Sequence, residues 1–215
     1  MSKIILFQGD SITDCGRSRD IGNDYAGSGY AQLVKAALGC EAPGEYTFIN
    51  RGVSGDRIVD IYARIKLDII NLKPDYMSLL IGINDVWHEI SRQNGVAPEK
   101  FEKIYDMLLT EIKEALPDIK IMLFGAYVLK GTATENTEEI PDRWERFKTG
   151  AETNAAIAKR LAEKHGLPYI PLQEVFDKAC EKAEPSYWAW DGVHPTPMGH
   201  ELIKKEWLKG FESIK

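Results

Sequence analysis

Four short polar clusters contain the residue types that acyl-transfer chemistry requires. They are Gly9-Asp10-Ser11, Asn50-Arg51-Gly52, Gly82-Ile83-Asn84-Asp85 and Asp191-Gly192-Val193-His194. A serine hydroxyl is a poor nucleophile at neutral pH, so it needs a base that takes its proton and later returns it to the leaving alcohol. Ser11 is the candidate nucleophile and His194 is the candidate base. Asp191 lies three residues before His194, so its carboxylate can accept a hydrogen bond from the imidazole and stabilise the imidazolium.

The elements that must position these clusters are predicted by five short apolar runs, with segments of helical spacing between them. This alternation is typical of an α/β protein. Several runs lack polar alternation, as expected for parallel strands that are covered on both faces. In a parallel sheet, functional groups collect beyond the carboxyl ends of the strands, and three of the clusters directly follow a predicted strand. The predicted strands are residues 4–7, 47–50, 77–81, 119–124 and 168–170.

The clearest predicted helix begins after Gly55, with Asp56 as its N-cap, and carries apolar residues at three- and four-residue steps until Pro74 stops it at about residue 72. Residues 130–141, rich in Thr and Glu, are predicted to form a loop. No repeat or linker divides the chain, so we expect a single domain over residues 1–215. Its expected fold is a three-layer α/β/α sandwich with a five-stranded parallel sheet. Further helices are predicted over residues 30–38, 98–115, 143–164, 173–182 and 197–209.

Read together, the four clusters resemble the SGNH (GDSL-type) hydrolase family, whose name refers to a Ser, a Gly, an Asn and a His in four blocks. The corresponding residues here are Ser11, Gly52, Asn84 and His194, in the family's order and across nearly the whole chain. Each cluster alone is typical of a capped turn, but the four in order favour catalysis. The resemblance implies a flavodoxin-like SGNH hydrolase fold and a serine esterase that works through an acyl-enzyme without a cofactor.

The same resemblance implies an oxyanion hole with three donors: the backbone N–H groups of Ser11 and Gly52 and the side-chain amide of Asn84. Each such donor contributes roughly 3 to 4 kcal/mol to stabilising a tetrahedral intermediate. Glycine allows a close backbone approach, and asparagine donates without adding a charge. Asp10, Asp14 and Asp85 adjoin these residues, and we interpret them as hydrogen-bond acceptors that hold the loops.

Longer stretches are similar to the intracellular acetylxylan esterases of bacteria. They are residues 9–17, 27–30, 82–87 and 189–195. This similarity implies acetylated xylo-oligosaccharides as substrates and a homo-oligomeric assembly. An acetyl group needs only a small pocket, whereas a sugar favours aromatic platforms, and Trp87, Tyr187, Trp188 and Trp190 lie in or beside the motif loops. Asp10, Trp87 and Trp190 are the candidate substrate-binding residues, although these aromatic side chains could equally pack a loop or an oligomer contact.

Other chemistries fit these residues less well. The position two residues after Asp10 is Ile12 rather than an acid, which argues against an aspartate-based phosphatase, and no P-loop or G-x-S-x-G elbow is present. A metal site at Asp191, His194 and His200 matches no familiar zinc spacing. His88 and His165 are predicted to be surface or packing residues without evident partners. A short-chain lysophospholipase or thioesterase activity is the alternative within the enzymes, and a catalytically idle flavodoxin-like binding module is the alternative outside them.

The composition restricts the class of binding partner and the cellular location that we expect. The 215 residues include 33 acidic and 27 basic side chains, a net charge of −6, which disfavours nucleic acid or an anionic membrane as the partner. Cys15, Cys40 and Cys180 are an odd number of widely spaced cysteines, as expected for reduced thiols. Only four strongly apolar residues follow Lys3, too few for a signal-peptide core. We therefore expect a cytoplasmic protein that acts on a small acetylated carbohydrate.

Overall fold

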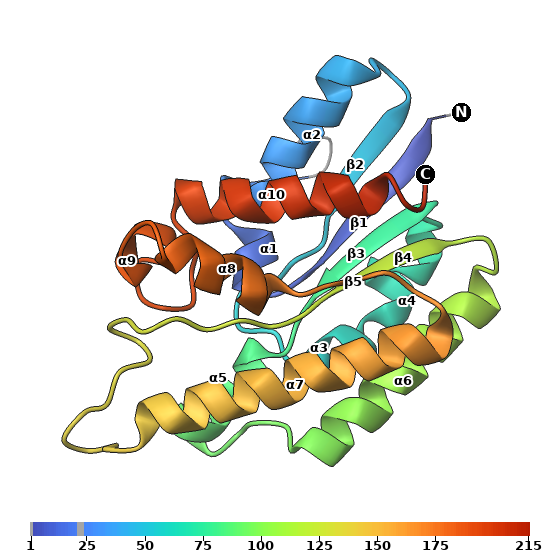
Figure 1. Cartoon of the computed structure of the whole chain (residues 1–215). Coiled ribbons are helices and arrows are strands. Elements are labelled where there is room, and N and C mark those ends of the chain that lie inside the picture. Colours follow the sequence, from blue (N-terminus) through green and yellow to red (C-terminus); the bar gives the residue numbers. More distant parts are fainter. Residues whose placement is uncertain (1, 21–23) are drawn as a thin grey trace.

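The computed structural model describes residues 2–20 and 24–215, and its centre is a five-stranded, all-parallel sheet (Figure 1). The strand order is β2-β1-β3-β4-β5. This confirms the predicted α/β fold with a five-stranded parallel sheet. The strands are β1 (Lys3–Gly9), β2 (Tyr46–Asn50), β3 (Tyr76–Leu80), β4 (Lys120–Phe124) and β5 (Tyr169–Ile170).

Helices cover both faces of the sheet because successive strand residues point to opposite sides. In β1, Ile5 and Phe7 join one hydrophobic cluster and Leu6 joins the other. The first cluster is covered by α2 (Tyr30–Glu41), α8 (Leu172–Cys180) and α10 (Pro197–Phe211). The second is covered by α3 (Ile58–Ala63), α4 (Ile65–Asp68), α6 (Pro98–Ala115) and α7 (Arg143–His165), and Figure 1 shows α2 and α10 on one side with α6 and α7 on the other.

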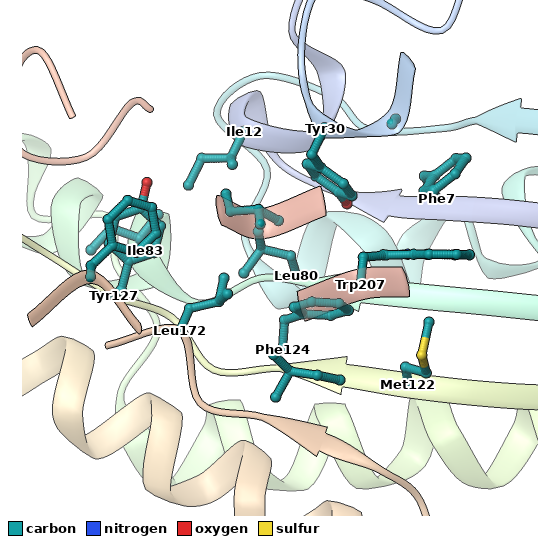
Figure 2. Packing of buried hydrophobic residues seen from close by; sticks show 14 of the residues in the cluster. Phe7, Ile12, Tyr30, Leu80, Ile83, Met122, Phe124, Tyr127, Leu172 and Trp207 are labelled. Atoms are coloured by element: carbon teal, nitrogen blue, oxygen red, sulfur yellow. The ribbon is translucent and has the colours of Figure 1, made fainter. Parts of the chain in front are cut away.

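A fully buried tryptophan anchors α10 to the sheet. The Trp207 ring lies 5.4 Å from that of Phe7 and 5.0 Å from that of Phe211, centroid to centroid. Figure 2 shows Trp207 among the side chains of Phe7, Phe124 and Met122. Large aromatic side chains bury much apolar surface and so contribute strongly to the stability of a core. The sheet therefore provides a rigid base beneath the loops at its carboxyl edge.

Strand register brings the polar clusters together. Phe7 of β1 pairs with Asn50 at the end of β2, and Gly9 pairs with Leu80 at the end of β3. In this strand order the connections reverse direction between β1 and β3, and ligands of open α/β sheets bind outside the carboxyl ends of strands at that point. Ser11 follows β1 and Asn84 follows β3, so both lie at this reversal.

The prediction of one long helix that ends near residue 72 is wrong. The segment forms α3, α4 and a 3₁₀ turn at Ile70–Leu72, with breaks at Arg64 (φ −111°, ψ 13°) and Ile69 (φ −133°, ψ −69°). Arg57, rather than Asp56, is the N-cap of α3. The Arg64 side chain at the first break pairs with both Asp56 and Asp68, so Asp56 serves an ion pair instead of a helix cap.

Three short helices were not predicted: α1 (Ser11–Asp14), α5 (Ile83–Arg92) and α9 (Pro185–Trp188). The other predicted helices and strands are present, with each end within three residues of the prediction. Residues 130–141 form a loop, as predicted. Within the described residues, no helix is both long and apolar enough to cross a membrane.

Candidate active site

Ser11 is held at the mouth of the sheet by a tight turn between β1 and α1. Gly9 has φ +157°, and a Cβ there would lie 2.3 Å from the carbonyl oxygen of Leu80, so only glycine fits where β1 leaves the sheet beside β3. Asp10 caps α1, because its carboxylate accepts a hydrogen bond from the Ile12 N–H at 3.0 Å. Ser11 is the first residue of α1, and its Oγ lies 2.9 Å from Nε2 of His194.

His194 lies between Ser11 and Asp191, as the sequence predicts. Its Nδ1 is 2.7 Å from Oδ2 of Asp191, while Oδ1 of Asp191 accepts the backbone N–H groups of Val193 (2.9 Å) and His194 (2.8 Å). An ionised carboxylate can only accept, so Nδ1 carries the proton and Nε2 is free to accept the Ser11 hydroxyl proton. The three side chains therefore form a continuous hydrogen-bonded row.

The charges along this row support that protonation state. Burial raises the pKa of Asp191, but hydrogen bonds from the His194 ring and from the two backbone N–H groups outweigh it and hold the pKa below its ordinary value. The hydrogen bond to Asp191 raises the pKa of His194, against the opposing effect of burial, and the charges of Asp191 and Asp10 add to the increase. Asp191 thus stays ionised and makes His194 a stronger base.

The turn that carries Asp191 and His194 is supported by the chain that leaves β4. The Tyr127 hydroxyl donates to the carbonyl of Val193 at 2.8 Å, and the Leu129 N–H donates to that of Gly192 at 2.8 Å. Gly131 lies so close that a Cβ would be 2.4 Å from the carbonyl carbon of Asp191. Sequence reasoning missed this support because contacts to backbone carbonyls between distant loops leave little mark on residue type. Only Gly131 could have indicated a close backbone approach.

The oxyanion-hole prediction needs one correction, at Gly52. The Gly52 N–H donates to Oδ1 of Asn50 at 2.9 Å, and a Cβ on Gly52 would lie 2.4 Å from the backbone nitrogen of Asp14, so this glycine packs against α1. It does not line the cavity beside Ser11, whereas Gly55 does. The N–H groups of Ser11 and Gly55 have no acceptor among residues 2–20 and 24–215. Gly55 therefore replaces Gly52 as the candidate donor.

Asn84 is the second residue of α5 and faces the same cavity. Its Nδ2 donates one hydrogen bond, 3.1 Å long, to the carbonyl of Asp56, which fixes the amide and leaves its second proton available. Asn84 is 5% exposed. Asp85, the next residue, accepts the Ile58 N–H at 3.1 Å and so ties α5 to the start of α3. A neutral donor and two backbone N–H groups are thus available next to Ser11.

The three neighbouring aspartates hold loops, as predicted. Oδ2 of Asp14 accepts both the N–H and the hydroxyl of Ser54 at 3.0 Å, while Asp10 and Asp85 accept helix N–H groups. Burial raises the pKa of Asp10 and of Asp85 to about 7. Burial also raises that of Asp14, but hydrogen bonds from Arg19 and Ser54 outweigh it. The placement does not support Asp10 as a substrate-binding residue, since it is 1% exposed and lies outside the cavity lining.

A cavity of about 380 Å³ opens beside Ser11, and we call it the Ser11 cavity. The Trp87 ring forms part of its wall and lies 5.8 Å from the ring of His194. Trp190 stacks on the His194 ring at 5.5 Å and 17°, yet 60% of it is exposed. Both are thus placed where a bound alcohol group could contact them. The lining residues are Ser11, Ser54, Gly55, Asn84, Trp87, His88, Ser91, Arg92 and His194.

Two other predicted aromatic residues lie away from this cavity. Tyr187 and Trp188 pack edge to face at 4.9 Å in α9, beside a separate groove against α10. Sequence reasoning missed five lining residues, Ser54, Gly55, His88, Ser91 and Arg92. The last three follow Asn84 at helical spacing, so recognising α5 would have found them.

The histidines outside the row have other partners. Nδ1 of His200 accepts the Tyr30 N–H at 3.1 Å, and its Nε2 lies 3.5 Å from Sγ of Cys15, so His200 does not point at Asp191. Within the described part of the chain, no group of three or more His, Cys, Asp or Glu side chains is arranged to hold a metal ion. His165, predicted to lack a partner, pairs with Asp106 at 2.7 Å. The three cysteines are free thiols.

Known proteins resemble this chain over its length. The GDSL-like lipase/acylhydrolase family model matches residues 7–202. An acetylxylan esterase of Geobacillus stearothermophilus is 31% identical, over 98% of this chain and 95% of that protein. A crystal structure of a GDSL-like lipase from Parabacteroides merdae has a TM-score of 0.90 and 32% identity, covering 98% of this chain and 96% of that one.

The crystal structure of the Geobacillus stearothermophilus acetylxylan esterase Axe2 has a TM-score of 0.81 and 30% identity, covering 97% of this chain and 93% of that one. Catalytic mutants of Axe2 replace a serine, a histidine or an aspartate by alanine. The same three residue types make up the hydrogen-bonded row in this chain.

Proposed function

Since the chain belongs to the GDSL-like lipase/acylhydrolase family and is a carboxylic ester hydrolase, we propose that it removes acetyl groups from xylo-oligosaccharides or related acetylated sugars. The observation that carries the proposal is the row Ser11–His194–Asp191, with hydrogen-bond distances of 2.9 and 2.7 Å, at the edge of the Ser11 cavity. The acetylxylan esterase relative, similar over nearly the whole chain, supports the acetyl group as the acyl part.

In the first half of the reaction, Ser11 Oγ attacks the carbonyl carbon of the acetyl ester while its proton passes to Nε2 of His194. The carbonyl oxygen takes the electron pair of the double bond and becomes an oxyanion. The N–H groups of Ser11 and Gly55 and the free Nδ2 proton of Asn84 stabilise this charge. The bond to the sugar oxygen then breaks, and that oxygen receives the proton from His194, which leaves an acetyl group on Ser11.

In the second half, water takes the place of the sugar. Its oxygen attacks the acetyl carbon as His194 Nε2 accepts its proton, and the oxyanion forms again at the same donors. The bond to Ser11 Oγ breaks, Oγ regains the proton from His194, and acetate leaves. Asp191 remains ionised throughout, because its role is to orient and stabilise the imidazolium.

The surroundings of Ser11 favour a small acyl group and a polar alcohol group. Hydroxyl, imidazole and guanidinium groups from Ser91, His88 and Arg92 contribute to the cavity lining, which suits the hydroxyls of a sugar better than a long acyl chain. Trp190 presents an exposed ring face beside His194, the arrangement by which an aromatic side chain packs against the apolar face of a sugar. These features support the deacetylase over the lysophospholipase or thioesterase alternative.

The test compares wild type with Ser11→Ala on p-nitrophenyl acetate, butyrate and octanoate and on acetylated xylo-oligosaccharides. We expect acetate release and a preference for the acetyl ester in wild type, and loss of at least about 10³-fold in kcat for Ser11→Ala. Ser213→Ala, which removes an exposed hydroxyl bonded to its own turn, is the matched control and keeps the wild-type rate.

Mass spectrometry of wild type quenched during turnover should find Ser11 heavier by one acetyl group. Near-wild-type activity of a folded Ser11→Ala protein would refute the nucleophile assignment. A preference for octanoate would refute the deacetylase and favour the lipase or thioesterase alternative.

A further inference from the structure

The helix α5 separates two cavities, and one of its faces forms a wall of the Ser11 cavity. Asn84, Trp87, His88, Ser91 and Arg92 line the Ser11 cavity, at successive steps of three, one, three and one residues. Residues 85, 86, 89 and 90 line a separate cavity on the other side of α5. This is the spacing of two opposite faces of one α-helix. The wall therefore runs from the oxyanion-hole amide of Asn84 to Arg92, about 12 Å along the helix axis for eight residues.

Arg92, at the far end of this wall, is a cation without a partner. It is exposed, and among residues 2–20 and 24–215 no carboxylate or hydrogen-bond acceptor pairs with its guanidinium. By contrast, Arg19, Arg57, Arg64 and Arg160 each pair with an acidic side chain. A helix C-terminus favours a cation on any face of the last turn, so the helix alone does not explain why Arg92 lies on the cavity side.

The charge of the cavity wall has one sign. Among the residues that the structure describes, no acidic side chain lines the Ser11 cavity, although acidic residues outnumber basic ones in the chain. Burial lowers the pKa of His88, and the nearby charges of Arg92 and Arg57 lower it further, against a smaller opposing effect of Asp60. The field of Arg92 is thus felt one turn back along the wall, inside the cavity. A cation at a recess of this kind raises the local concentration of anions.

We propose that Arg92 determines specificity by binding an anionic group, a carboxylate or a phosphate, on the alcohol part of the substrate. This inference rests on the acetylesterase function proposed above. The anion must belong to the alcohol part, because a two-carbon acetyl group held at Ser11 cannot extend along a wall of about 12 Å. The preferred substrates are then acetylated sugar acids or acetylated sugar phosphates. Between the two ends, the substrate hydroxyls can reach His88 and the Ser91 hydroxyl, which donates to the carbonyl of Trp87 and can still accept.

Three matched sugars test the proposal: 3-O-acetyl methyl glucoside, 3-O-acetyl methyl glucuronoside and the 6-phosphate of the first. They differ only in the group at carbon 6, which is a neutral hydroxymethyl group, a carboxylate or a phosphate ester. The measured quantity is kcat/KM for acetate release, and the readout is the ratio of the anionic to the neutral substrate. This ratio cancels any effect that a variant has on both substrates equally.

We expect wild type to prefer at least one anionic sugar by about 10-fold, the lower end of what a hydrogen bond to a charged group contributes. The preference should fall to about 1 in Arg92→Gln, be largely retained in Arg92→Lys, and weaken as salt rises from about 0.05 to about 0.5 M. Arg146→Gln is the matched control, because Arg146 is also exposed but lines the cavity on the opposite side of α5. It removes the same charge and should keep the wild-type ratio.

Comparing the glucuronoside with the 6-phosphate distinguishes a carboxylate-binding site from a phosphate-binding site. A wild-type ratio near 1 for both anions, or an equal fall in Arg92→Gln and Arg146→Gln, would overturn the role of Arg92 while leaving the esterase in place. If the protein hydrolyses neither the sugars nor p-nitrophenyl acetate, the proposed function is overturned instead, and this inference with it.

Discussion

Gly131→Ala should damage catalysis from outside the hydrogen-bonded row. The new Cβ would lie 2.4 Å from both the carbonyl carbon of Asp191 and the nitrogen of Gly192, where ordinary contact begins at 3.4 Å. The peptide between Asp191 and Gly192 must therefore move by about 1 Å, or the loop must withdraw and lose the Leu129 and Ala133 hydrogen bonds to that turn. A displacement of about 1 Å in a catalytic group costs about 10²-fold in rate, so we expect kcat to fall about 100-fold and stability to fall by about 1 to 3 kcal/mol.

The assay measures kcat and KM on p-nitrophenyl acetate, together with the free energy of unfolding by denaturant at the same temperature. Gly39→Ala is the control: a Cβ there meets nothing within 4 Å, and Gly39 lies inside α2. It should leave kcat unchanged and add up to about 1 kcal/mol of stability, the ordinary gain from replacing glycine in a helix. A folded Gly131→Ala protein whose kcat is within about threefold of wild type would refute the argument that this loop positions Asp191 and His194.

Three further predictions concern the site itself. Activity needs neutral His194, and the hydrogen bond to Asp191 holds its pKa above the ordinary value, so kcat/KM should reach half its maximum at a pH above that of a free histidine and fall about tenfold per unit below it. Asp191→Asn, which removes the main cause of the increase, should move this limb to lower pH, and a pH-rate profile checks both. Asn84→Ala should lower kcat by about 10²- to 10³-fold with little change in KM, and a kcat within a few-fold of wild type would remove Asn84 from the oxyanion hole. Trp190→Ala should lower kcat/KM about 10-fold on acetylated xylo-oligosaccharides but far less on p-nitrophenyl acetate, whereas equal losses on both would mean that Trp190 supports His194 rather than the sugar.

Much of the site can be predicted from the sequence, because residue types, strand order and the family resemblance together indicate which side chains meet. A parallel sheet brings the ends of its strands to one edge, so Ser11 after β1 and Asn84 after β3 must be neighbours whatever the details of their loops. Asp191 and His194 are three residues apart in one turn, a spacing at which a carboxylate can reach an imidazole, although the loop after β4 holds the turn in place. The helices with a clear apolar stripe, such as α6, are predicted for the same local reason.

The remaining errors concern loops, where the path of the backbone decides which group faces the site. Gly52 and Gly55 both follow β2, and only the structure shows that the N–H of Gly52 is taken by Asn50 while Gly55 borders the cavity. The break at Arg64 depends on carboxylates at positions 56 and 68, which apolar periodicity does not register. The single domain over residues 1–215, the cytoplasmic location and the homo-oligomer stay predictions.

Two histidines near Ser11 show how environment, rather than residue type, assigns the base. Nδ1 of His194 faces an ionised carboxylate, which raises the pKa, so the ring can take and return a proton near neutral pH. Nδ1 of His200 instead accepts a backbone N–H, and burial together with the charge of His194 lowers the pKa to about 4. Since its Nδ1 must be unprotonated to accept the Tyr30 N–H, its Nε2 carries the proton and donates toward Cys15, so it can activate neither that thiol nor water. The base is therefore the histidine with an acid behind it, and the buried one remains neutral.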